Sequence, residues 1–229
     1  MGADWKNISE NAWPYKSGNY CITHLSSTKY FSPENAKLRP SYNPEEAKKL
    51  IKQVEKDAGK KIPPIYWLDS TTPACKNAGE MAKIQLKEVG IPINLQLLSH
   101  GIWFDKLLRD PKIEWDMGFI GMGAAEAPIR GFNNFVTNSK TAPDGKSLGG
   151  YSNPEFDQMI LKAEQSPNEE DQIRYYQDAE KILIEDSAAL PLFHWRMVIA
   201  WNKNVKGVVT HPQAGIYPYN SWANVWLDK

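Results

Sequence analysis

The sequence predicts an α/β fold, with a mainly parallel sheet flanked by helices. Strand-like segments at residues 65–68, 93–98 and 115–120 alternate with helical segments at 74–89 and 102–108. Connections of this length join parallel strands as right-handed crossovers. A chain of 229 residues is also long enough to bury a sizeable core without disulfides or metals.

The two ends of the chain differ from this centre. Residues 1–43 and the tail are aromatic and keep no sustained helical or alternating period. We therefore expect an irregular crossing segment at 1–43, an α/β ligand-binding lobe at 44–190, and a return crossing strand with a C-terminal tail at 191–229. Four tryptophans in the irregular ends indicate contact with another surface: Trp5, Trp13, Trp222 and Trp226.

The helices of the expected lobe have clear start signals. The first begins after Asn43, which is a good N-cap, with Pro44 in the first turn. Two later helices are opened by Asn153-Pro154 and by Asn168 with the three acidic residues that follow it. Each of the four longest expected helices has an apolar face. In the helix after Asn43 the face is Ala47, Leu50, Ile51, Val54 and Ala58, and in the helix at 74–89 it is Ala78, Ala82, Leu86 and Val89. In the helix after Asn153 the face is Phe156, Met159, Ile160 and Ala163, and in the helix after Asn168 it is Ile173, Tyr176, Ala179 and Leu183.

Composition and motifs exclude several classes of function. Basic and acidic residues both number 27, and no basic stripe is present, so we expect no nucleic-acid partner. No run approaches the ~18 apolar residues of a membrane span. The start lacks a signal peptide, as expected for a cytoplasmic protein or for a chain that begins inside a longer one.

Motifs for cofactor or metal chemistry are missing as well. The four histidines are too scattered for a metal site, and neither a phosphate loop nor a nucleophile elbow occurs, so we expect no cofactor. Cys21 and Cys75 leave two possibilities open, one disulfide or two free buried thiols.

The best candidate site is the stretch at residues 121–134. It follows the third predicted strand, and open α/β folds place their ligands at the carboxyl ends of strands. Small residues keep its backbone accessible, and polar groups of both signs lie nearby: Glu126, Arg130, Asn133 and Asn134. The alternative is a plain strand–helix connection with a solvated Glu and Arg.

Nine tryptophans make this residue the outlier in composition. Flat indole faces suit sugar rings and peptide planes, so some of them are candidates for stacking on a ligand. For Trp67 and Trp115, inside predicted strands, packing in the core is favoured. For Trp103 the two interpretations are balanced.

Four segments together resemble one family. They are D-x-x-x-x-G at 116–121, Y-S-N-P-E-F-D at 151–157, the helix end A-E-K-I-L at 179–183, and P-L-F-H at 191–194. This order resembles the extracellular solute-binding proteins of family 5, the peptide/nickel class of bacterial ABC importers. The helix start at 43–50 and the turn K-E-V-G-I at 87–91 are also similar to that family, and the resemblance covers about residues 40–210.

The resemblance implies a lobe of the periplasmic-binding-protein type II kind. Such proteins have two lobes that close on a solute, and this chain resembles the C-terminal lobe with its crossing segments, with the N-terminal lobe absent. The implied role is the substrate-binding component of an importer, which delivers an oligopeptide or similar small solute to a membrane permease. The implied location is periplasmic or extracellular, with membrane association through the permease or a lipid anchor.

The chain departs from the family where the ligand would be selected. Peptide-binding members tend to carry G-W-x-A-D after the central strand, where the aspartate holds a peptide's ammonium group. Here Met122 replaces the indole and Ala125 the carboxylate, with Glu126 as a substitute one residue on. A sugar-binding or opine-binding member of the same family is therefore an alternative.

The residues expected to bind the substrate come from the loop and the return crossing. They are Met122, Glu126, Arg130 and Asn134, together with Phe193, His194 and Trp195. We expect no catalytic residue. The competing hypotheses are a hydrolase that uses Glu126 with His194 as an acid–base pair, and a free-standing interaction module whose partner surface is formed by the aromatic ends.

Overall fold

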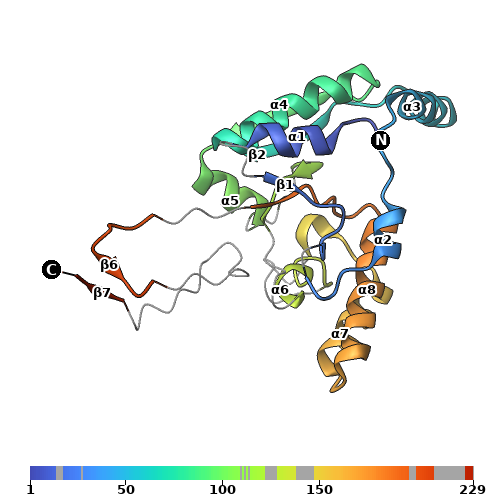
Figure 1. The fold of residues 1–229 in the computed structure, drawn as a ribbon. Helices are drawn as coiled ribbons and strands as arrows, with labels where there is room; N and C mark the ends of the chain where they lie inside the picture. Colours follow the sequence, from blue (N-terminus) through green and yellow to red (C-terminus); the bar gives the residue numbers. More distant parts are fainter. Residues whose placement is uncertain are drawn as a thin grey trace.

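The computed structural model of the protein describes residues 1–13, 18–26, 28–108, 110, 112, 114–121, 128–137, 147–195, 200–208 and 225–228. Figure 1 shows two bodies, one built around a sheet and one built from helices. We call them the sheet unit and the helical unit. The described helices are α1 (Trp5–Ala12), α2 (Pro33–Leu38), α3 (Pro44–Ala58), α4 (Pro73–Glu88), α5 (His100–Leu108), α6 (Ile129–Phe132), η3 (Leu148–Gly150), α7 (Pro154–Gln165) and α8 (Glu169–Glu185).

The sheet unit contains three parallel strands in the order β3-β2-β4. Strand β2 (Ile65–Ser70) pairs with β3 (Ile93–Leu98) along its whole length, from Ile65 opposite Ile93 to Ser70 opposite Leu98. The other neighbour, β4 (Met117–Gly118), is shorter than the strand expected at 115–120, and it pairs with β2 through Trp67 and Leu68. The predicted α/β class with a parallel sheet is confirmed.

Helices cover both faces of this sheet. Helices α1 and α4 pack over the side of Trp67, and Ala78, Ala82, Leu86 and Val89 of the predicted face are all buried there. On the opposite face, Trp103 and Leu107 of α5 pack against Leu68. Trp67 and Trp103 are therefore core residues.

Two expectations for this half of the chain are wrong. The stripe of α3 is not a buried face, because only its Ala47 is buried, while Leu50 and Val54 are 48% and 53% exposed. Residues 1–43 contain two helices, α1 and α2, where no helical period was expected. Both have N-caps, since Asp4 accepts from the amide of Asn7 and Ser32 from the amide of Asn35.

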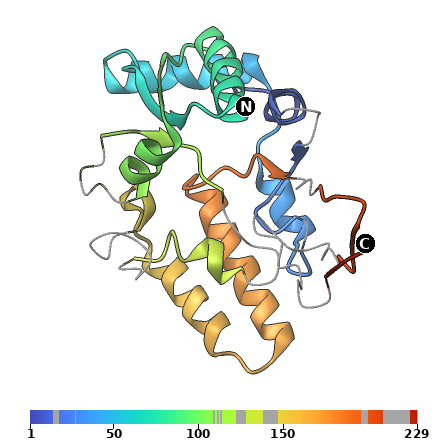
Figure 2. The same cartoon turned by 90° about the vertical axis from the view of Figure 1, so that its left-hand side faces the viewer.

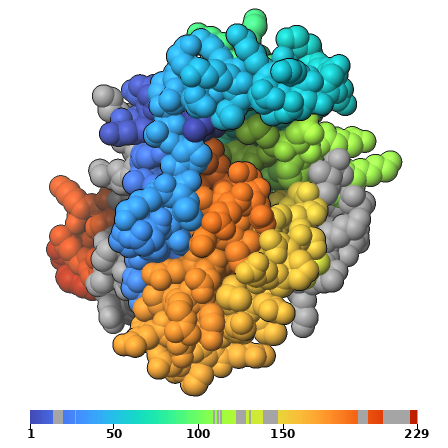
Figure 3. Space-filling view, turned by 90° about the vertical axis from the view of Figure 1, so that its right-hand side faces the viewer, coloured from blue at the N-terminus to red at the C-terminus, as the bar shows by residue number. Residues whose placement is uncertain are grey.

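The helical unit has the core that the two later helices predict. Phe156, Ile160 and Ala163 of α7 are buried with Tyr176, Ala179 and Leu183 of α8, and Met159 and Ile173 are partly buried at the edge. Leu25 and Tyr30 of the N-terminal segment complete the same core. Figures 2 and 3 show the consequence, since the blue N-terminal segment with α2 lies against the orange helix α8.

Two short antiparallel ribbons complete the description. Strand β1 (Gly18–Tyr20) pairs with β5 (Phe193–Trp195), and β6 (Val205–Lys206) pairs with β7 (Trp226–Leu227). Figure 1 shows the β6–β7 pair well away from both units, with Trp201 and Trp226 45% and 55% exposed. In the described part of the chain, no helix combines the length and the apolar character needed to cross a membrane.

Candidate functional site

The predicted substrate-binding residues are described to different extents. Met122 and Glu126 lie outside the described residues. The backbone of Arg130 belongs to α6, and His194 and Trp195 form β5 with Phe193, but only Phe193 among these has a described side chain. Asn134 is partly buried, two residues after α6. The predicted set therefore stays a prediction, as does the acid–base pairing of Glu126 with His194.

Three aromatic side chains from distant segments meet beside the predicted loop. The ring centroids of Trp13 and Phe193 are 4.1 Å apart, those of Phe119 and Phe193 5.5 Å apart, and the last two rings are stacked at 17°. Trp13 also contacts Phe119, at 6.4 Å. All three side chains are partly exposed. We call Trp13, Phe119 and Phe193 the aromatic cluster.

Each member of the aromatic cluster is positioned by the end of a secondary-structure element. Trp13 is the C-cap of α1, and the carbonyl before it, on Ala12, accepts from the Asn77 side chain of α4 at 3.3 Å. Phe119 directly follows β4, at the carboxyl end of the sheet. Phe193 begins β5, whose pairing with β1 places it opposite Tyr20. The cluster thus lies where the sheet unit meets the β1–β5 ribbon.

The predicted loop is anchored on both sides of its undescribed part. Strand β4 fixes the chain before Gly121, and Pro128 is fully buried where the description resumes. Phe132 and Phe135 are then buried in the core of the helical unit. The Asn134 carbonyl accepts from the amide of Leu148 at 2.6 Å. The loop therefore runs from the aromatic cluster in the sheet unit to the core of the helical unit.

A buried polar group lies at the carboxyl end of β2. Asp69 is 1% exposed; its Oδ1 accepts from the Ser70 amide at 2.7 Å, and its Oδ2 is buried without a partner of good hydrogen-bond geometry in the part of the chain that the structure describes. Burial raises the pKa of Asp69 to about 6, partly offset by the Ser70 amide and by the nearby Cys75 and Trp67 side chains. The Trp67 indole Nε1 also has no partner of good geometry. Sequence reasoning missed this carboxyl group because a polar residue before a helix start resembles an ordinary cap.

The described residues offer no alternative centre of chemistry. No group of three or more His, Cys, Asp or Glu side chains within them is arranged to hold a metal ion. Cys21 and Cys75 are both free and buried, which decides between the two possibilities left open by the sequence. Burial raises the pKa of the Cys75 thiol to about 11, so this thiol stays protonated at neutral pH.

The aromatic ends only partly form the outward surface expected of them. Trp5 packs against Trp67 inside the sheet unit, with ring centroids 6.4 Å apart, so its predicted role on an outer surface is wrong. Trp13 belongs to the aromatic cluster, and Trp226 is exposed. Trp222 lies outside the described residues. Sequence reasoning identified Phe193 but missed Trp13 and Phe119 as its partners.

Comparison with known proteins gives this arrangement a context. The chain is 26% identical over 174 residues to the dipeptide-binding protein DppE of Bacillus subtilis, a match that covers 74% of this chain and 30% of that protein. A dipeptide-binding protein from Pseudoalteromonas sp. SM9913, solved in complex with Met-Leu, superposes with a TM-score of 0.77 at 22% identity, over 99% of this chain and 43% of that one. The ABC transporter substrate-binding protein CtaP from Listeria monocytogenes superposes with a TM-score of 0.76 at 17% identity, over 100% of this chain and 45% of that one.

The chain is a relative of the family 5 peptide-binding proteins of ABC importers. The predicted resemblance to this family and the predicted periplasmic-binding-protein type II fold are thus confirmed. No protein-family model matches the chain. It spans between 24% and 34% of the length of the curated relatives that it matches. Their names refer to peptides and give no support to a sugar or an opine.

Proposed function

We propose that this chain is the C-terminal lobe of the substrate-binding component of an ABC importer, and that it binds a peptide against an opposing N-terminal lobe. The relationship to proteins named for dipeptides and oligopeptides supports this proposal. The chain spans 43% to 45% of the solved relatives quoted above, which leaves room for a second lobe. In this role the chain binds its substrate without transforming it.

The observation that carries the proposal is the aromatic cluster. A partly exposed Trp, Phe and Phe at the carboxyl end of a parallel sheet offer flat apolar faces, which suit peptide planes and apolar side chains. The predicted loop begins at Gly121, two residues after Phe119. We propose that Met122, Glu126, Arg130 and Asn134 contact the peptide beside this cluster, together with Phe193, His194 and Trp195.

Charge on the loop gives each of its ionic residues a role. In the proposal, Arg130 pairs with the carboxylate of the peptide, because a guanidinium binds a carboxylate through two parallel hydrogen bonds. Glu126 takes the ammonium group, in place of the aspartate that the family carries one position earlier. Closure of the two lobes traps the peptide, because the closed state alone supplies contacts from both sides.

The proposed cellular role follows from the relatives. One of them is named as a periplasmic peptide transport protein, SapA of Haemophilus influenzae. We therefore infer that the protein works outside the cytoplasmic membrane and delivers its peptide to an ABC permease there. Association with the membrane through that permease or a lipid anchor is part of the same proposal.

Isothermal titration calorimetry on the full-length protein tests the proposal. We expect saturable binding of a dipeptide probe such as Met-Leu, and no binding of a disaccharide or an opine at the same concentration. Loss of one stacked aromatic ring from the cluster should weaken binding about three- to tenfold in Phe193→Ala. Phe31→Ala is the matched control, because Phe31 is 36% exposed and lies outside the cluster. Binding of a sugar but of no di-, tri- or oligopeptide would overturn the proposal.

A further inference from the structure

Arg39 joins two parts of the chain that lie far apart in sequence. Its Nη1 donates to the carbonyl oxygens of Cys21 at 2.7 Å, Ile22 at 3.1 Å and Pro191 at 2.6 Å. Its guanidinium also lies over the Tyr20 ring, with Cζ 4.9 Å from the centroid. One side chain therefore holds both strands of the β1–β5 ribbon at the same end, directly after β1 and directly before β5.

Further hydrogen bonds fix the same end of the ribbon. The Leu192 carbonyl accepts from the Cys21 amide at 3.2 Å and from Ser9 Oγ of α1 at 2.8 Å. The next residue is Phe193, the central member of the aromatic cluster. The two backbone carbonyls before Phe193 are thus each held by a side chain from the N-terminal segment, so the position of its ring depends on Arg39 and Ser9.

The electrostatics show that Arg39 does not serve as one half of an ion pair. It makes no salt bridge with any acidic side chain in the described chain. Burial lowers the pKa of its guanidinium, but a guanidinium stays charged in proteins. Its Nη2 is buried without a hydrogen-bond partner in the described chain. The contacts of this half-buried cation are therefore with three backbone carbonyls that flank the ribbon and with the ring of Tyr20 within it.

We propose that Arg39 is a positioning residue for substrate binding, which sets Phe193 against Trp13 and Phe119 by tying the two strands of the ribbon together. The proposal rests on the proposed peptide-binding function for its consequence, but not for its geometry. The planar guanidinium of Arg39 covers the Tyr20 ring and at the same time donates from Nη1 to the carbonyls. The compact ammonium group of a lysine cannot do both, so a lysine cannot replace this arginine. Arg39 does not touch the substrate in this proposal and acts through Phe193.

Hydrogen exchange of the full-length protein without substrate tests the geometry. The variants are Arg39→Met and Arg39→Lys, and Arg174→Met is the matched control. Arg174 also lies over a tyrosine ring, with Cζ 5.0 Å from the Tyr175 centroid, but it pairs with Asp171 on its own helix and connects no distant segments. We expect exchange of backbone amides at 18–22 and 192–195 to become at least about tenfold faster in both Arg39 variants, with α4 and α8 unchanged. Unchanged exchange in the ribbon, or equal acceleration throughout the protein, would overturn the proposal.

A double-mutant cycle then tests the link to binding. Arg39→Lys should weaken the affinity for the Met-Leu probe, and the Arg39→Lys/Phe193→Ala double variant should bind no more weakly than Phe193→Ala alone. Additive losses, or unchanged affinity in Arg39→Lys, would refute a role through Phe193. If the wild-type protein binds no peptide probe, the proposed function fails, whereas the exchange experiment still decides whether Arg39 positions the ribbon.

Discussion

Among the described residues, each unit buries one carboxyl group, and the two groups have different partners. In the helical unit, Glu180 is fully buried; its Oε1 accepts from the Leu25 amide at 2.8 Å and its Oε2 from the Asn35 side chain at 3.1 Å. In the sheet unit, Asp69 Oδ1 accepts from the amide of the next residue, while its Oδ2 has no partner of good hydrogen-bond geometry within the described residues, although the Cys75 and Trp67 side chains lie nearby. Burial raises the pKa of both carboxyl groups.

The difference shows what each carboxyl group holds in place. The donors to Glu180 are 155 and 145 residues away in the chain, so this side chain attaches the N-terminal segment to α8. The bond of Asp69 is local and fixes only the turn between β2 and α4. We infer that Glu180 stabilises the fold by connecting distant segments, whereas Asp69 reduces stability whenever it is charged.

Replacement of Glu180 should have the largest effect. Glu180→Ala leaves two buried donors without an acceptor, and each such donor costs about 1–3 kcal/mol, so we expect a loss of about 3–5 kcal/mol in the free energy of unfolding. Denaturant unfolding measures it. Glu185→Ala is the control, since Glu185 is exposed on the same helix, where it pairs with Lys181. A loss in Glu180→Ala no greater than in the control would mean that Glu180 does not attach the N-terminal segment.

Asp69 should produce a pH dependence of stability. Its pKa is about 6 in the folded protein and near 3.8 when unfolded, so the folded state holds this proton more tightly. Stability should therefore fall as pH rises from about 4 to 6, by about 2–3 kcal/mol in all, at 1.36 kcal/mol per pKa unit. Below pH 4 both states are protonated, and the penalty is absent.

The Asp69→Asn variant isolates this contribution. The free energy of unfolding of wild type minus that of the variant should decrease between pH 4.5 and 7.5, as measured by urea titrations at several pH values. Glu180, whose pKa is raised too, titrates in both proteins and cancels in the difference. Parallel pH profiles of the two proteins would show that Asp69 is solvated or paired.

Local patterns predicted much of the fold because they reflect burial along one element. The strand at 93–98 and helices α4, α7 and α8 follow from apolar periodicity and N-caps, and their expected faces are buried or nearly so. The same reasoning fails for α3, whose Leu50 and Val54 have helical spacing but are exposed. Helices as short as α1 depend on tertiary packing, which an irregular sequence pattern does not reveal.

Long-range pairing explains what the sequence could not predict about the site. Phe193 was identified from its place in the return crossing, but its contacts with Trp13 and Phe119 depend on the pairing of β1 with β5. Arg39 and Glu180 likewise have partners that are distant in sequence. On sequence evidence Arg39 is an ordinary charged residue of an irregular segment and Glu180 an ordinary charged residue of a helix. No local pattern identifies a partner more than a hundred residues away.

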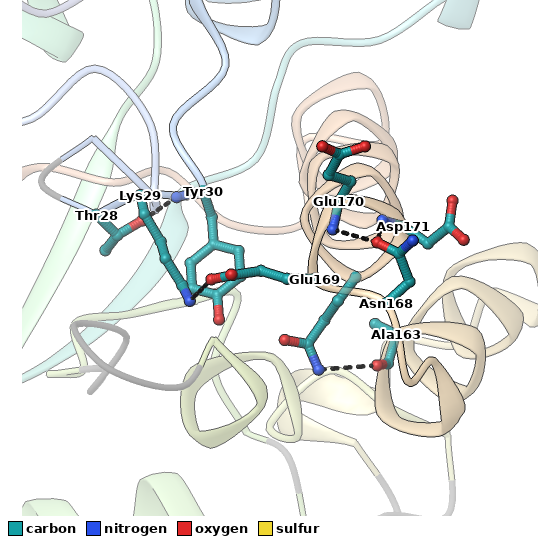
Figure 4. Close-up of polar contacts among 9 residues, drawn as sticks. Thr28, Lys29, Tyr30, Ala163, Asn168, Glu169, Glu170 and Asp171 are labelled. Carbon is teal, nitrogen blue, oxygen red and sulfur yellow. Dashed lines mark hydrogen bonds and ion pairs between the residues drawn. The ribbon is translucent and has the colours of Figure 1, made fainter.

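The start of α8 allows the connection through Glu180 to be compared with a local cap. Asn168 Oδ1 accepts from the amides of Glu170 at 2.8 Å and Asp171 at 3.4 Å, as Figure 4 shows. Asn168→Ala should lower the free energy of unfolding by about 1 kcal/mol, the usual loss for a removed N-cap. Asn168→Asp, which keeps the acceptor, is the control and should be nearly neutral. A loss as large as that of Glu180→Ala would remove the distinction between local and long-range polar contacts.

The exposed ion pair in the same view should matter least. Lys29 pairs with Glu169 and, like Glu180, connects the N-terminal segment to α8 (Figure 4), but the two side chains are 54% and 64% exposed. Solvent screens such a pair, and the ordering of two long side chains opposes it, so Lys29→Ala should leave the unfolding midpoint almost unchanged. Urea titrations at low and high salt measure this. A clear loss that disappears at high salt would mean that surface charge also helps to attach the N-terminal segment to α8.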